Sequence, residues 1–213
     1  MIEQLTWFER HVARLLVVLY HGGRPVRSLL EGETRQFDSV WELQRFDFWV
    51  REPGHLALAL LDTASADDVE RRATVDRMLL DDGLDTHRVA LPGASYNTLA
   101  DFDASVSFLT ARALVADRPS FTRGKNYAHQ IVLESAGIAF TERLLAECPS
   151  FAWYRQQCET VAAYFTQLEL IDLTLMPYLA PELTPIQASS ARLAGVIRNR
   201  YERIFGNTEH VVV

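Results

Sequence analysis

The chain lacks the features that mark several common classes of protein. Its 213 residues include two cysteines, Cys148 and Cys158, which are too few for a disulfide framework and too far apart for paired zinc ligands. No apolar run approaches the ~20 residues that a membrane helix needs. The first residues also lack the basic and then apolar segment of a secretory signal. We therefore expect a cytoplasmic protein without a membrane segment.

Motifs for catalysis are also missing. There is no glycine-rich phosphate-binding pattern, and none of the six dispersed histidines forms an i, i+4 pair around a glutamate. Ser95 and Ser135 lack the glycine-framed turn of a nucleophilic serine. We expect surface or capping positions for the histidines, buried structural thiols, and a non-enzyme without metal or cofactor. An enzyme whose site is assembled from distant residues is the remaining alternative.

Basic residues are scarce and unevenly placed. The formal net charge is −7, and Lys125 is the one lysine among 21 basic residues. Residues 61–104 carry four arginines against ten acids, whereas residues 105–133 carry three arginines and Lys125 against Asp117 alone. Because affinity for nucleic acid depends mainly on neutralising phosphates, the whole chain is predicted to bind polyanions poorly. Residues 105–133 are the exception.

What the chain does contain is a series of apolar residues at helical spacing. This spacing predicts helices over residues 2–21, 40–51, 66–82, 94–113, 151–168 and 184–203. A short helix near 55–61 and a short strand near 87–91 complete this part of the prediction. Leu15 to Tyr20 is interpreted as one side of an amphipathic first helix. Ser39 is the expected N-cap of helix 40–51, with Glu42 in the position of a capping box.

Residues 105–146 carry the most informative pattern. A helix ending at Ala113 precedes a strand at 114–117, a turn-rich loop at 118–126, a strand at 129–133 and a further helix that ends at Ala146. Helix, strand, basic loop, strand and helix is the order of elements in the second half of a winged helix. The predicted fold class is mainly α with a small β-hairpin. We expect a composite winged-helix domain over 1–147, a helical C-terminal extension over 148–206 and a flexible tail over 207–213.

The loop of this hairpin is the candidate nucleic-acid contact. It contains Arg118, Arg123, Lys125 and Asn126, where the tip of a wing would meet phosphates or a minor groove. The alternative is a solvated loop whose charges keep a sheet edge soluble. Helix 94–113, in the recognition position, places Asp101 and Asp103 toward a groove, and phosphates would repel them. Any DNA contact is therefore predicted to be weak and independent of sequence.

Aromatic residues provide the candidate partner surface. Helix 40–51 has large apolar groups on too many sides for a single stripe, so it belongs either to the core or to an interface. Aromatic anchors dominate binding energy when a partner buries them. The partner-binding candidates are Trp41, Phe48, Trp49, Tyr154 and Phe165.

Two segments carry a resemblance to a known group of proteins. The stretch from Ala113-Leu114-Val115 to Ile131-Val132-Leu133-Glu134-Ser135-Ala136-Gly137 resembles bacterial winged-helix proteins whose wing ends in a Leu-Thr-x-x-Gly-like helix start, with serine in the threonine position. The helix Leu43-Gln44-Arg45-Phe46-Asp47-Phe48-Trp49-Val50-Arg51-Glu52-Pro53 resembles a helix of winged-helix middle subunits of bacterial three-component systems built on ABC- or SMC-type ATPases, including defence systems. The resemblance implies a non-catalytic, kite-like adaptor that bridges a coiled-coil ATPase to a further subunit. A dimeric winged-helix transcriptional regulator is the alternative.

Overall fold

The computed structural model describes residues 6–28, 32–80, 99–121, 127–168, 171 and 190–206. The chain divides into two compact units. Unit 1 comprises residues 1–50 and 89–163, and unit 2 comprises residues 51–88 and 164–213. Each unit therefore combines two segments that are distant in sequence.

Unit 1 contains a small sheet and its covering helices. In chain order its elements are α1 (Trp7–Gly22), β1 (Arg24–Ser28), β2 (Gly32–Phe37), α2 (Val40–Arg51), α6 (Leu99–Ala111), β3 (Val115–Phe121), β4 (Tyr127–Leu133), α7 (Ser135–Glu147), the short 3₁₀ helix η2 (Pro149–Phe151) and α8 (Ala152–Leu168). Arg51 at the end of α2 and the last five residues of α8 belong to unit 2.

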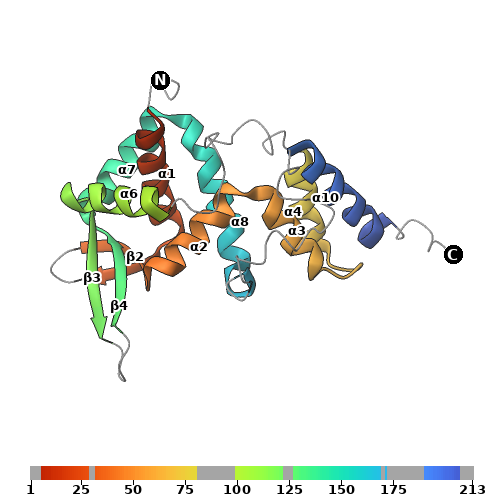
Figure 1. Cartoon of the computed structure of the whole chain (residues 1–213), viewed down its shortest axis with the longest axis horizontal. Helices are drawn as coiled ribbons and strands as arrows, with labels where there is room; N and C mark the ends of the chain where they lie inside the picture. Colours follow the sequence, from red (N-terminus) through yellow and green to blue (C-terminus); the bar gives the residue numbers. More distant parts are fainter. Residues whose placement is uncertain are drawn as a thin grey trace. The chain divides into compact units, whose positions relative to one another are not determined.

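The four strands form one antiparallel sheet in the order β1-β2-β4-β3. Helix α6 leads directly into the β3–β4 hairpin, and β2 pairs with the other side of β4, with Phe37 opposite Ile131. Helices α1 and α7 pack against β2 and β4, and α6 contacts β3 (Figure 1). A helix followed by a hairpin, with an earlier strand beside its second strand, is the winged-helix arrangement. The predicted fold class, mainly α with a small β-hairpin, is confirmed.

The strands nevertheless extend beyond the prediction. The hairpin strands are longer than 114–117 and 129–133, because residues 118–121 and 127–128 also pair. Residues 24–28 and 32–37, for which no strand was predicted, form a further antiparallel pair, β1 with β2. Its apolar content is low, and Phe37 is buried because β4 lies beside it. The expected strand at 87–91 lies outside the described residues.

Helix α1 is the central helix of unit 1. A capping box begins it: Thr6 Oγ1 accepts from Glu9 N, and the Glu9 carboxylate accepts from Thr6 N at 2.7 Å. All nine residues from His11 to Leu19 are buried, because α6, α7, β2 and β4 all contact this helix. The interpretation of Leu15 to Tyr20 as one side of an amphipathic helix is therefore corrected, since the helix is covered on every side along most of its length.

A close backbone approach joins the hairpin to α7. Glu134 N donates to Leu114 O at 3.0 Å, which links the chain after β4 to the residue before β3. Gly137 lies in the first turn of α7, where a Cβ atom would come 2.2 Å from Leu114 O and 2.5 Å from Leu133 Cδ1. Only a residue without a side chain fits there, and this fixes where α7 leaves the sheet.

Unit 2 is helical in its described part. It contains α3 (Pro53–Asp62), α4 (Val69–Leu80) and α10 (Ser190–Phe205), which contact one another (Figure 1). Every residue from Pro53 to Leu61 except His55 is buried. Gly54 allows the closest approach, because a Cβ atom there would lie 2.4 Å from Leu193 Cδ2. Arg200 forms an ion pair with Asp62 and so links α10 to the end of α3.

This division corrects the expected domain boundaries. We expected one domain over 1–147 and an extension over 148–206, but residues 51–80 belong with the C-terminal helix α10. Conversely, most of α8 belongs with the sheet unit. The physical reason is that the apolar helix α3 is covered by a helix more than 130 residues later in the chain. The proposed tail at 207–213 lies outside the described residues.

Candidate interaction surfaces of the sheet unit

Helix α6 occupies the position from which a winged helix reads DNA. The helix contains no lysine or arginine, and its exposed residues include Asp103, Ser107 and Thr110. Arg112, in the turn that follows, stacks over the ring of Phe108 with its guanidinium carbon 4.9 Å from the ring centroid. The side chain of Asp101 lies outside the described residues. Apart from Phe108, the described exposed side chains of α6 are one carboxylate, two hydroxyls and two alanine methyl groups, so they offer little attraction to a phosphate backbone.

One of the four expected nucleic-acid contacts, Arg118, lies among the described residues. Arg118 lies on β3 and donates to Glu134 Oε1 at 2.7 Å, with its side chain 40% exposed. Arg123, Lys125 and Asn126 lie outside the described residues. Arg118 is thus already paired with a carboxylate at the base of the hairpin.

Pairing with acids extends across the described sheet. Arg24 contacts Asp38 at 2.6 Å, Arg35 contacts Glu33 at 2.8 Å, and His129 Nδ1 lies 2.9 Å from Asp117. Exposed pairs of this kind add little stability, but each one neutralises its neighbourhood. The described part of the sheet is therefore not a continuous basic surface.

Both edges of the sheet are protected against strand addition. β1 contains Pro25 and β3 contains Pro119, while the two inner strands have no proline. Proline offers no N–H to a further strand, which makes it a common device on sheet edges. A partner of this unit is therefore expected to dock on helices rather than extend the sheet.

Three of the five aromatic partner candidates are core residues. Phe48, Trp49 and Tyr154 are 5%, 0% and 6% exposed. For helix 40–51 this favours the core alternative, and the candidate set is corrected to that extent. Phe165 is half-buried. Trp41, near the start of α2, is 72% exposed and remains open to a partner.

A buried polar cluster that the sequence did not reveal joins α1 to α2. Arg14 donates from Nε to Asp47 Oδ1 at 2.9 Å and from Nη2 to Asp47 Oδ2 at 3.2 Å. The same Nη2 lies 3.0 Å from His11 Nδ1, which must accept because a guanidinium only donates. All three residues are 1–2% exposed. His11 is thus a core residue rather than the expected surface residue, and the cluster positions α2 rather than forming a site.

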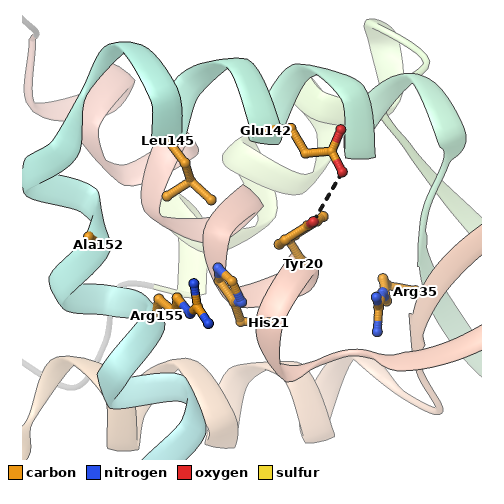
Figure 2. A pocket seen from close by; sticks show the side chains of 7 residues that line it. All are labelled: Tyr20, His21, Arg35, Glu142, Leu145, Ala152 and Arg155. Carbon is orange, nitrogen blue, oxygen red and sulfur yellow. Dashed lines mark hydrogen bonds between the residues drawn. The ribbon is translucent and has the colours of Figure 1, made fainter.

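A cavity of about 570 Å³ opens beside the C-terminal end of α1. Four elements of unit 1 supply its lining: Tyr20 and His21 from α1, Arg35 from β2, Glu142 and Leu145 from α7, and Ala152 and Arg155 from α8 (Figure 2). Tyr20 Oη donates to Glu142 Oε1 at 3.1 Å, and the Arg35 guanidinium lies 5.8 Å from the Tyr20 ring centroid. The cavity is therefore mixed in character, with both charged and apolar lining.

Two titratable groups that line this cavity, His21 and Tyr20, have shifted pKa values. Burial lowers the pKa of His21, and the positive charges of Arg155 and Arg35 lower it further, against an opposing effect of Glu159. Burial and the Glu142 carboxylate raise the pKa of Tyr20. His21 Nε2 and Arg35 Nε are buried and have no hydrogen-bond partner among the described residues. Sequence reasoning missed the cavity because its residues come from positions 20 to 155 and follow no motif.

The cysteines and the possible metal ligands among the described residues do not come together in a site. Cys158 is buried, and burial raises the pKa of its thiol strongly; Cys148 is half-buried, and neither forms a disulfide. No three histidine, cysteine or acidic side chains of the described residues come together as a metal site. Within the same residues, no helix combines the length and apolarity needed to cross a membrane.

Comparison with known proteins gives no match to a family model, to a curated protein or to a solved structure.

Proposed function

We propose that the chain is a non-catalytic winged-helix adaptor subunit that bridges an SMC- or ABC-type ATPase to another subunit of a bacterial complex of the defence type. The observation that carries this proposal is the chemistry of α6. A winged helix that reads DNA most often uses basic or amide side chains there, and a carboxylate is repelled by the phosphates; the described face of α6 exposes Asp103, Ser107 and Thr110. Such a face suits a protein surface better than a phosphate backbone.

The rest of unit 1 supports a docking role. The described cations Arg24, Arg35 and Arg118 are paired with carboxylates, and both sheet edges carry proline. Trp41 is a large aromatic side chain at 72% exposure, and such side chains are frequent anchors at interfaces. A partner that docks on α2 would bury the Trp41 side chain, which is otherwise exposed to water.

Co-purification tests the proposal. The tagged full chain, purified from its host cells, is expected to retain an SMC- or ABC-type ATPase subunit, and Trp41→Ala is expected to reduce the retained ATPase about tenfold or more. Val69→Ala is the matched control, because Val69 is an equally exposed apolar residue (75%) in unit 2. Retention of no ATPase, together with tight binding to one DNA sequence, would overturn the adaptor in favour of the dimeric regulator.

Contact with DNA by the hairpin loop is a secondary role in this proposal. Replacing Arg123 and Lys125 by glutamate is expected to weaken association with DNA of any sequence at low salt and to flatten its salt dependence. Fluorescence anisotropy at two salt concentrations measures both effects. An unchanged affinity with an unchanged salt slope would remove the loop from the proposal while leaving protein docking in place.

A further inference from the structure

We propose that the cavity lined by α1, β2, α7 and α8 binds one carboxylate group carried on a small apolar body. This goes beyond the adaptor role and does not depend on it. The cavity is formed by unit 1 alone, with lining residues from Tyr20 to Arg155. Its volume of about 570 Å³ falls within the usual range of sites for small ligands.

The basic lining residues favour an anion. Arg35 and Arg155 approach the cavity from opposite sides, and His21 lies close to Arg155 (Figure 2). Arg155 donates to Glu159 through Nε at 2.9 Å, and Arg35 contacts Glu33 through Nη2 at 2.8 Å. Each guanidinium has five N–H donors, so both retain donors beyond these pairs. A planar guanidinium fork matches the geometry of a carboxylate.

Unsatisfied buried nitrogens point to a missing partner. His21 Nε2 and Arg35 Nε are buried without a hydrogen bond in the described residues, although buried polar atoms in folded proteins nearly always have one. A ligand that draws the Arg35 and His21 side chains toward it would give both atoms an acceptor. Burial is the main cause of the lowered pKa of His21, and the charges of Arg155 and Arg35 add to it; a bound anion would offset this second contribution.

The acidic neighbours limit the charge of the ligand. Glu142 lines the cavity and accepts a hydrogen bond from Tyr20 Oη, and Glu33 and Glu159 pair with Arg35 and Arg155. These three carboxylates would repel a phosphate dianion or a polyanion more than a single carboxylate. Leu145, Ala152 and the Tyr20 ring supply an apolar wall. The combination fits a monocarboxylate with a short aliphatic part.

The test uses the isolated full chain and a matched pair of probes, N-acetyl-L-leucine and N-acetyl-L-leucinamide. The ring signals of His21 in NMR spectra report on occupancy. We expect the acid to shift these signals saturably and to raise the pKa of His21, because the bound negative charge stabilises the imidazolium. The uncharged amide should produce no saturable shift. An equal response to both probes, or to neither at tens of millimolar, would overturn the carboxylate site.

Variants locate the binding. The Arg155 side chain is 63% exposed, so its replacement should not disturb the fold. Arg155→Gln is expected to weaken the binding of N-acetyl-L-leucine about tenfold. Arg35→Gln should act in the same direction. Arg27→Gln is the control, because Arg27 is exposed on the same sheet and does not line the cavity. Equal weakening by Arg27→Gln would mean unspecific attraction and would overturn the site.

The bound carboxylate could belong to a free small acid or to the C-terminal residue of another chain. A peptide ending in a free leucine carboxylate separates them. Tighter binding of the peptide than of N-acetyl-L-leucine identifies a chain terminus, and equal or weaker binding identifies a small acid. Both results support the carboxylate site, and because no ATPase is present, neither depends on the adaptor role.

Discussion

Two ion pairs in unit 1 join neighbouring elements but differ completely in their surroundings. Arg14 and Asp47 connect α1 to α2 with both side chains 1–2% exposed, whereas Arg24 and Asp38 lie at the sheet edge with side chains about 60% exposed. A buried pair contributes mainly through the damage caused when one partner is lost. An exposed pair is screened and close to neutral. Burial, not the residue types, therefore decides which pair holds the unit together.

The largest effect is expected from breaking the interior pair. Asp47→Asn leaves the Arg14 guanidinium buried without a counter-charge, and the free energy of unfolding should fall by about 3–5 kcal/mol. Chemical denaturation monitored by circular dichroism measures the loss. The double variant Arg14→Met with Asp47→Leu removes both charges and is expected to recover most of it. A double variant as unstable as Asp47→Asn would mean that the pair itself, and not the orphaned charge, supplies the stability.

A second test compares a glycine that is closely surrounded by other atoms with a glycine that has open space around it. Gly137→Ala places a Cβ atom 2.2 Å from Leu114 O and should cost about 1–3 kcal/mol, since backbone must shift. Gly195→Ala in α10 meets no atom within 4 Å and should stabilise unit 2 by about 0.5–1 kcal/mol. Opposite shifts in thermal midpoint are the expected result. A midpoint that Gly137→Ala leaves unchanged or raises would contradict the packing at α7.

The exposed pair should matter far less. Arg24→Gln is expected to change the free energy of unfolding by no more than about 1 kcal/mol, because water and salt screen its interaction with Asp38. Repeating the denaturation at high salt should abolish even this difference. A loss comparable to that of Asp47→Asn would show that exposure is a poor guide to the energy of these pairs.

The smallest effect concerns His21 at the cavity. Its pKa is lowered in the folded state, first by burial and then by Arg155, so the unfolded chain binds its proton more readily. The resulting stability is complete above the unfolded pKa of about 6.5 and declines as pH falls below it. Urea midpoints from pH 8 to pH 5 should therefore fall more steeply for the natural chain than for His21→Gln. Parallel pH profiles would contradict a neutral His21.

Much of the fold was predictable where local signals agree. The helices α1 and α2 follow from apolar spacing, and Ser39 Oγ accepts from Glu42 N at 3.0 Å as expected of an N-cap. The β3–β4 hairpin and the helices before and after it were predicted from apolar spacing and from the turn-rich loop between the two strands. The antiparallel pair of β1 and β2 was not, because its few apolar residues become buried only when β4 pairs with β2. Of the candidate sites, Trp41 is exposed as an interface requires, whereas Phe48, Trp49 and Tyr154 are interior.

The sequence by itself determined most of the helices, the β3–β4 hairpin with its winged-helix order and the acidic character of α6, because these depend on neighbours within a few turns of chain. The tertiary structure decided which helices share a unit, which arginines are neutralised and which histidine is buried. It also brought Tyr20, Arg35, Glu142 and Arg155 around one cavity. The physical reason is that burial and pairing are properties of contacts between distant segments, and those contacts form only when the chain has folded.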